Sequence, residues 1–557
     1  MSRILRSNFK PGSPNWAGRR AQWRALGLSD ADMEKPKIAI VNSSSELAIC
    51  FSHLDGVAAK VKEAIRAAGG MPFEVRTAAP SDFITNAGRH GGYILPTRDL
   101  ITSDIEVQVE GAMLDGMLCL ASCDKTTPGQ LMAAGRLNIP TIVVVCGYQD
   151  SGQYRGQHID IEEVFLKSSY VASGGVSLAE ITEMADNAVK SPGVCAGMGT
   201  ANSMHIVCEA LGMALPGSSP VRANSPKMME HVRRAGERIV QMVWNDEKPR
   251  DIMSAESFAN AAMVVLALSA SINTVKHLQA IAMECELDVD VYELFARYAN
   301  QIPLLAAIRP TGEDLIEDLE AAGGARAVMK RLEKLLFANA RTVSGQTVGE
   351  ALRGVEVADE SVIHTLERPV SKPPSLVIVK GSLLPGGGIV RLGGPAERTL
   401  RFSGPANIFH SREEAMVAIG RGAVKPGEVV VLRGIGVKGG PGLAMTSSVV
   451  FALDGAGLID KVGVVTEGQL SGLVNRGLVV GEASPEAMEG GPLGLVNNGD
   501  SITIDVLARE VNLDVPEAVL EARRAEQRQY GSRTERGWLS VYQRTVQPVH
   551  KGAVLLK

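Results

Sequence analysis

Between residues 37 and 147, short apolar runs alternate with stretches that carry apolar residues at helical spacing. We expect strands at 37–41, 71–75, 116–122 and 139–147, and helices at 53–70, 99–114 and 127–137. Alternating strands and helices predict right-handed crossovers and a parallel sheet that is covered by helices. Ligands of such sheets bind beyond the carboxyl ends of the strands, so a site is expected in the loops that follow these strands.

The chain changes character near residue 370. Residues 205–340 carry mostly helical patterns, and three prolines between residues 366 and 375 interrupt them. Short β-rich runs separated by glycines follow, at 375–381, 427–437, 461–468 and 500–506, and they favour a β-barrel or sandwich. Because 557 residues exceed what one hydrophobic core holds, we expect two domains, an α/β domain over 1–368 and a barrel-like domain over 376–557 that closes the active site.

Charge and hydropathy exclude several classes of partner. The formal net charge is −5, so no basic field is available to hold nucleic acid or an anionic membrane. No apolar run approaches the roughly 18 residues of a membrane-spanning helix. The first residues contain no apolar signal-peptide core, and a cytoplasmic protein is therefore expected.

The seven cysteines form no Cys-x-x-Cys pair, and their number is odd. A disulfide framework or a zinc ribbon is therefore not indicated. Free cysteines are most often small buried hydrophobic residues, which is what we expect for most of these seven.

One stretch, "CLASCDKTTPGQLMAAG" at 119–135, places Cys123, Asp124 and Lys125 side by side after a predicted strand. A thiolate prefers soft or borderline metals and a carboxylate prefers Mg²⁺, so the two residues could serve two different metals. An ammonium would repel a cation. Lys125 therefore either forms a structural ion pair with Asp124 or becomes an anionic ligand by carbamylation, and the spacing alone leaves both open.

This stretch and five others resemble the dihydroxy-acid and sugar-acid dehydratase family, in the same order along the chain. The segments are "NSSSELAICFSHL", "LPTRDLITSDIE", "SCDKTTPGQLMAA", "GVCAGMGTANSMHIVCEALGMALPG", "TVSGQTVGE" and the long block from "EGQLSG" to "NNGDSITID". The family is similar in fold to the prediction above, with an α/β N-terminal domain, a β-rich C-terminal domain and an active site between them.

The resemblance implies two cofactors and a base. By residue match, Cys50, Cys123 and Cys195 would hold an iron–sulfur cluster, of the [2Fe-2S] rather than the [4Fe-4S] type. Three thiolates leave an iron position open as a Lewis acid. Asp82, Asp124 and a carbamylated Lys125 match the ligands of Mg²⁺, and Ser471 matches the serine that acts as base.

The implied reaction is the dehydration of a 2,3-dihydroxy carboxylate to a 2-keto-3-deoxy acid. We expect a hydro-lyase that acts on a small hydroxy acid, with a sugar acid as the first choice of substrate. One alternative is the branched-chain biosynthetic dihydroxy-acid dehydratase, and another is an iron–sulfur relative that has lost the activity. The resemblance also implies a homodimer or homotetramer.

The sequence departs from the family pattern in the C-terminal half. Met445 replaces a glutamate that completes the family's magnesium site, and methionine is a poor ligand for a hard cation. An aspartate and an arginine before the serine are replaced by Glu467 and Gln469, and Leu473 stands where threonine is common. Four interpretations follow: Glu467 supplies the missing carboxylate, the substrate supplies its own oxygen ligand, Mg²⁺ binds more weakly with water in the gap, or the activity is lost. We expect a working enzyme with a changed substrate rather than a lost activity, with Glu467 as the candidate ligand.

Overall fold

The computed structural model describes residues 4–88, 91–171, 174–393, 398–526 and 536–555. Its first half contains a parallel sheet in the order β2-β1-β3-β4. The strands are β1 (Lys37–Asn42), β2 (Met71–Arg76), β3 (Gly116–Ala121) and β4 (Thr141–Val145). All four predicted strands are thus confirmed, together with their parallel order.

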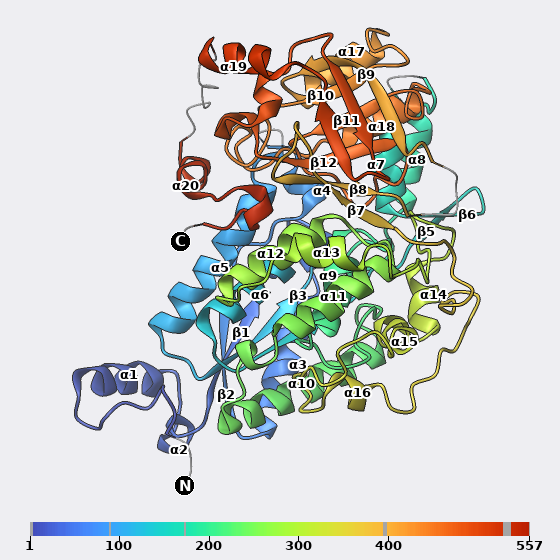
Figure 1. The fold of residues 1–557 in the computed structure, drawn as a ribbon. Coiled ribbons are helices and arrows are strands. Elements are labelled where there is room, and N and C mark those ends of the chain that lie inside the picture. Colours follow the sequence, from blue (N-terminus) through green and yellow to red (C-terminus); the bar gives the residue numbers. More distant parts are fainter. Residues whose placement is uncertain (1–3, 89–90, 172–173, 394–397, 527–535, 556–557) are drawn as a thin grey trace.

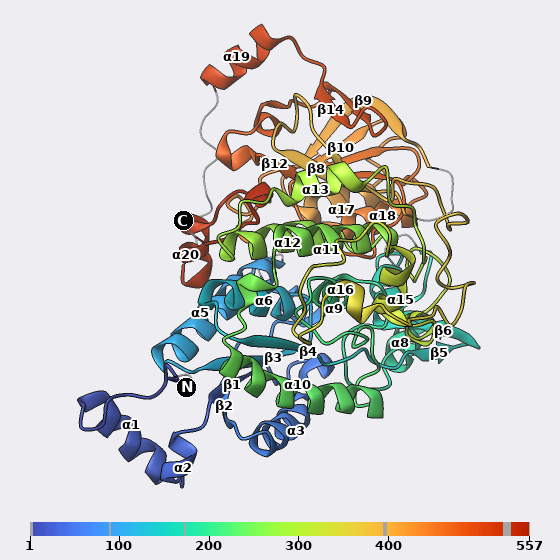
Figure 2. The same ribbon diagram turned by 60° about the horizontal axis from the view of Figure 1, so that its bottom comes forward.

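Helices cover both faces of this sheet, which explains why β1, β3 and β4 are buried at every position. Helices α3 (Leu54–Ala67) and α10 (Pro226–Asn245) lie on one face, and α5 (Ile94–Gly111) and α6 (Thr126–Leu137) lie on the other (Figure 2). Helix α5 begins at Ile94, five residues before residue 99, where the sequence predicted its start. A second helical layer follows, with α9 (Thr200–Ala210), α11 (Ala255–Ala267), α12 (Asn273–Glu284) and α13 (Val291–Tyr298).

The second half is built on one eight-stranded sheet in the order β14-β13-β9-β10-β11-β12-β8-β7. Its strands are β7 (Leu376–Val379), β8 (Gly387–Arg391), β9 (Arg401–Phe409), β10 (Val429–Leu432), β11 (Gly463–Thr466), β12 (Leu478–Ser484), β13 (Ser501–Asp505) and β14 (Glu510–Leu513). A backbone bridge between Lys380 and Glu510 joins the two ends of the sheet, so it curls into the predicted barrel-like form.

The centre of this barrel-like sheet is parallel, which the sequence did not predict. Strands β9 to β12 run parallel to one another. Helices α17 (Arg412–Gly420) and α18 (Ser447–Gly455) form two of the crossovers between them. The loops at the ends of these strands therefore meet the first half of the molecule along one face (Figure 1).

The C-terminal end of the chain returns to the first half of the molecule. Helix α20 (Trp538–Thr545) lies beside α5 (Figure 1), where Leu95 shares a buried cluster with Tyr542 and Val549. The buried guanidinium of Arg98 donates hydrogen bonds to the carbonyls of Gly552 and Ala553, at 2.9 and 2.8 Å. The division into 1–368 and 376–557 stays a proposal, because the tail and the main hydrophobic core span both halves.

The other helices and strands of the described residues are α1 (Pro14–Ala25), α2 (Asp30–Met33), α4 (Asp82–Thr85), β5 (Gly152–Tyr154), β6 (Gln157–Ile159), α7 (Ile161–Ser168), α8 (Leu178–Asn187), α14 (Ile316–Ala321), α15 (Gly324–Arg331), α16 (Val348–Ala351) and α19 (Glu517–Glu526). Short 3₁₀ turns lie at Ile49–Phe51, Pro249–Asp251, Ala487–Glu489, Pro492–Leu495 and Val549–Lys551. Within the described ranges, none of the helices combines the length and the apolar character that crossing a membrane requires.

Candidate active site

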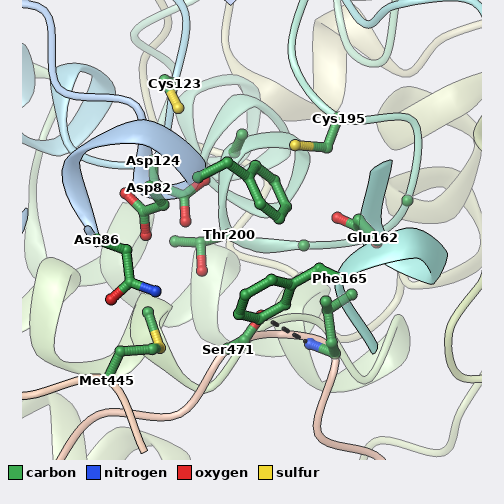
Figure 3. Close-up of a pocket in the computed structure, with 15 residues that line it drawn as sticks. Asp82, Asn86, Cys123, Asp124, Glu162, Phe165, Cys195, Thr200, Met445 and Ser471 are labelled. Carbon is green, nitrogen blue, oxygen red and sulfur yellow. Dashed lines mark hydrogen bonds between the residues drawn. The ribbon is translucent and has the colours of Figure 1, made fainter. Parts of the chain in front are cut away.

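A cavity of about 580 Å³, including the open space at its mouth, lies where the two halves of the molecule meet (Figure 3). Its wall combines loops that follow strands of the first sheet with loops of the barrel-like sheet. The lining residues include Asp82, Phe83, Asn86, Cys123, Asp124, Glu162, Phe165, Cys195, Thr200, Met445, Ser471 and Leu473. A cavity thus lies in the predicted place, beyond the carboxyl ends of strands β2 and β3.

Two of the three predicted cluster cysteines, Cys123 and Cys195, line this cavity, and Cys50 lies against Cys123. Cys50 lies in the turn after β1, and the hydroxyl of Ser122 donates to its carbonyl at 2.6 Å. Cys123 follows β3, and its thiol interacts directly with that of Cys50. Cys195 lies in the loop before α9, where the side-chain amide of Asn202 donates to its carbonyl at 2.7 Å. Three different loops thus bring these cysteines to one region of the molecule, without gathering the three thiols around a single metal position among the described residues.

The surroundings of these thiols disfavour thiolates in the absence of a metal. The interaction with Cys50, burial and the nearby carboxylates raise the pKa of the Cys123 thiol well above its usual range. Burial and the charge of Glu162 raise the pKa of Cys195 in the same direction. Bound metal reverses this preference, because it stabilises the deprotonated sulfur. The other four cysteines, Cys119, Cys146, Cys208 and Cys285, are buried in the core, as expected.

A second group consists of two carboxylates and a lysine. Asp82 is the first residue of α4, and Asp124 follows Cys123 after β3. The Lys125 ammonium is fully buried, 3.1 Å from an oxygen of Asp82 and 3.8 Å from one of Asp124. Burial lowers the pKa of Lys125, but the two carboxylates outweigh it and raise the pKa overall. Burial and Asp82 raise the pKa of Asp124 to about 7.

The fit of this group to Mg²⁺ depends on Lys125. The Oδ1 atom of Asp82 is buried without a hydrogen-bond partner among the described residues, so it is free to bind a cation. In the described part of the chain, no three histidine, cysteine, aspartate or glutamate side chains are gathered around one metal position. Two carboxylates and a carbamylated Lys125 would provide three oxygen-bearing ligands, which suits a hard cation.

The structure places Glu467 away from the wall of the cavity. Its carboxylate accepts hydrogen bonds from the backbone amides of Gly434, Ile435 and Ala487, at 2.6, 3.3 and 2.5 Å. These bonds hold it inside the barrel-like half, and it does not line the cavity. These contacts do not support Glu467 as the missing carboxylate ligand, and that role stays a prediction. Met445 does line the cavity and gives this side of the wall an apolar surface (Figure 3).

Ser471 faces the cavity across from Cys123 and Asp124 (Figure 3). Its hydroxyl oxygen accepts a hydrogen bond from the backbone amide of Leu473 at 3.2 Å, and its own amide donates to the hydroxyl of Ser447 at 2.6 Å. The carbonyl of Leu470, one residue earlier, accepts a bond from Asn273 of α12 at 3.0 Å. Both halves of the molecule thus fix the position of this serine.

Glu162 of α7 lines the cavity, and the sequence analysis did not single it out. Its side chain lies against the backbone of Gly197 and Gly199, where a Cβ atom would come within 1.9 and 2.5 Å of its oxygens. The two glycines near Cys195 leave the space that this carboxyl group fills. Glycines have many uses, so the sequence alone offered only a weak signal for this arrangement.

Comparison with known proteins agrees with the geometry. The family model described as dihydroxy-acid/6-phosphogluconate dehydratase, N-terminal, matches residues 35–351, and the corresponding C-terminal model matches residues 361–553. The chain is 41% identical to a dihydroxy-acid dehydratase of Methanococcoides burtonii over 98% of this chain and 99% of the relative. It is also 41% identical to the dihydroxy-acid dehydratase of Methanothrix thermoacetophila, over 99% of this chain and the whole relative.

These matches cover nearly the whole chain, including each segment that carries a predicted site residue. The cavity, the grouped cysteines and the paired carboxylates lie where the two matched models meet. The chain therefore belongs to the dihydroxy-acid/6-phosphogluconate dehydratase family and is a hydro-lyase.

Proposed function

We propose that this enzyme removes water from a 2,3-dihydroxy carboxylate and releases a 2-keto-3-deoxy acid. The observation that supports this most directly is the convergence on one cavity of Cys123, Cys195, Asp82, Asp124 and Ser471, from both halves of the molecule. Each type of group has a use in such a reaction. A base must take the proton from C2, and the hydroxyl at C3 must be helped to leave.

Two cofactors would complete the site. Cys50, Cys123 and Cys195 would hold an iron–sulfur cluster, and Asp82, Asp124 and a carbamylated Lys125 would hold Mg²⁺. When bound, these groups supply Lewis-acid chemistry at the hydroxyl and carboxylate oxygens of the substrate. The type of cluster, [2Fe-2S], stays a prediction, as does a homodimeric or homotetrameric assembly.

Ser471 would accept the proton from C2. A serine hydroxyl is a weak base unless its oxyanion is stabilised, and the hydrogen bond from the amide of Leu473 favours that anion. Proton removal at C2 and departure of hydroxide from C3 yield an enol, which becomes the keto acid by proton transfer to C3. Phe165 and Met445 contribute apolar surface at the cavity, where they exclude water from the reacting atoms.

The comparisons favour a small dihydroxy acid as the first substrate to test. The relatives are named dihydroxy-acid dehydratases, which supports the branched-chain alternative better than a sugar acid. The apolar side chains of Met445, Phe165 and Leu473 suit an aliphatic substrate such as 2,3-dihydroxy-3-methylbutanoate. A sugar acid is retained as the second candidate because Glu162, a carboxylic acid, also faces the cavity.

The test is keto-acid formation by protein that has been reconstituted anaerobically with iron, sulfide and Mg²⁺. We expect turnover of 2,3-dihydroxy-3-methylbutanoate or of an aldonate, and loss of turnover in Ser471→Ala with the iron content unchanged. No keto acid from any C4 to C6 dihydroxy or polyhydroxy acid, with a fully loaded cluster, would show that the chain has lost the activity.

A further inference from the structure

Glu162 has no part in the proposed chemistry, although it lies in the wall of the active cavity. It is the second residue of α7, and only 7% of its surface is exposed. Gly197 and Gly199 form a cradle for the carboxyl group, because a side chain on either glycine would collide with it. The local backbone thus accommodates an acid at a position where an apolar residue would cost less to bury.

This carboxyl group receives no hydrogen bond from any residue in the described ranges. The neighbouring Glu163 differs in part, since its Oε1 atom forms an ion pair with Lys167 at 2.9 Å, while its Oε2 atom has no hydrogen-bond partner among the described residues. The guanidinium of Arg391 interacts with Glu162 only electrostatically. The Arg391 guanidinium donates hydrogen bonds instead to the carbonyls of Ser269 and Gly472 and to the hydroxyl of Thr311. A buried carboxyl group without a partner is costly, so a ligand that donates a hydrogen bond would be stabilised here.

The position of Glu162 indicates which part of a ligand would meet it. In Figure 3 it lies on the Cys195 side of Thr200, away from the carboxylates of Asp82 and Asp124. Glu162 and Leu473 also line a second, outer cavity of about 910 Å³. Glu162 therefore stands where the inner and outer spaces meet, and a substrate anchored near Asp82 and Asp124 would extend its far end toward it.

We propose that Glu162 is a specificity-determining residue that accepts a hydrogen bond from a hydroxyl carried by the substrate beyond the two reacting carbons. This inference rests on the proposed dehydratase function. Of its two candidate substrates, it selects the polyhydroxylated acid of four or more carbons over the aliphatic acid that the names of the relatives support. An aliphatic acid would leave the carboxyl group buried and unpaired, so it would bind less well. Sites built around a hydrogen bond reject the analogue that lacks the donor.

The test compares two substrates that differ in one hydroxyl, 2,3,4-trihydroxybutanoate and 2,3-dihydroxybutanoate, each as a panel of stereoisomers. The holoenzyme should prefer the trihydroxy acid in kcat/KM. Glu162→Leu, which keeps a similar volume without the acceptor, should lower this preference about 10- to 100-fold. Glu163→Leu, the same change at the adjacent carboxylate, which is paired with Lys167 through one oxygen, should leave the preference unchanged.

Binding provides a second readout that does not depend on turnover. In the Ser471→Ala holoenzyme, calorimetric dissociation constants should show the same preference, and adding Glu162→Leu should remove it. An unchanged preference in Glu162→Leu would overturn the inference. An equal loss for both acids that is rescued by excess Mg²⁺ would also overturn it, because it would make Glu162 a metal ligand. Selective binding without turnover by the wild type would support Glu162 as the specificity residue and refute the proposed function.

Discussion

The ammonium of Lys276 lies 2.5 Å from a carboxylate oxygen of Glu482, and both side chains are fully buried. Lys276 belongs to α12 of the first half and Glu482 to β12 of the barrel-like sheet. Lys276 also donates to Asn273, which in turn donates to the carbonyl of Leu470 beside Ser471. One buried ion pair thus joins the two halves and supports the segment that carries the proposed base.

Removing one partner of this ion pair should destabilise the protein strongly. Lys276→Met leaves the Glu482 carboxylate buried without its cation, which costs about 3–5 kcal/mol in comparable cases. The double variant Lys276→Met/Glu482→Gln should recover part of this loss, because it leaves no unpaired charge. Urea unfolding followed by circular dichroism measures the free energy of unfolding of the single and the double variant. A Lys276→Met variant as stable as the wild type would contradict the assigned role of the pair.

Ser471→Ala should lower kcat about 10²- to 10⁴-fold, because it removes a general base. In the described part of the chain, the hydroxyl of Ser471 takes part in one hydrogen bond, which it accepts from the backbone amide of Leu473. Its loss should therefore leave the fold and the iron content unchanged. The measurement is kcat together with iron per chain for wild type and variant. Ser447→Ala is the matched control, since it removes a hydroxyl that supports the backbone of Ser471. We expect Ser447→Ala to lower kcat less than Ser471→Ala does. An equal loss of kcat in the two variants would argue against Ser471 as the base.

Carbamylation of Lys125 should control the affinity for Mg²⁺. In the unmodified state its ammonium lies between Asp82 and Asp124 and neutralises them, whereas a carbamate would add a ligand and remove the positive charge. Protein depleted of carbon dioxide should require more Mg²⁺ for half-maximal activity, and bicarbonate should restore it. Carbon-13 NMR after labelling with bicarbonate should show one carbamate, which Lys125→Arg abolishes. An activity indifferent to bicarbonate, with no labelled carbamate, would contradict this prediction.

Met445→Glu should strengthen the binding of Mg²⁺. Met445 lines the cavity, so a carboxylate at this position can add an oxygen ligand that methionine cannot supply. We expect the Mg²⁺ concentration for half-maximal activity to fall, while Met445→Gln, of similar length but uncharged, should change it much less. Activity that appears only in Met445→Glu, from a parent without turnover, would instead identify the natural chain as one that has lost its function.

The first sheet could be predicted because its strands are continuous apolar runs, as expected for strands covered on both faces. Strand β9 was missed because Gly404 and Pro405 interrupt its pattern, although its pairing with β10 and β13 holds it extended. The resemblance to the family pointed to Cys123, Cys195 and Asp124, and the structure places all three at the cavity. The positions of Glu467 and Glu162 could not be predicted, because a sequence does not reveal which carboxyl group the backbone amides hold and which faces a cavity.

The central claim is that Cys50, Cys123 and Cys195 hold an iron–sulfur cluster. The most direct test is the iron and acid-labile sulfide content per chain, with the visible spectrum, of protein purified without oxygen. A [2Fe-2S] cluster predicts about two irons and two sulfides per chain. They should be lost in Cys123→Ala and retained in Cys119→Ala, which alters a fully buried thiol of β3 in the core. No iron after anaerobic reconstitution, or equal iron in both variants, would contradict the account.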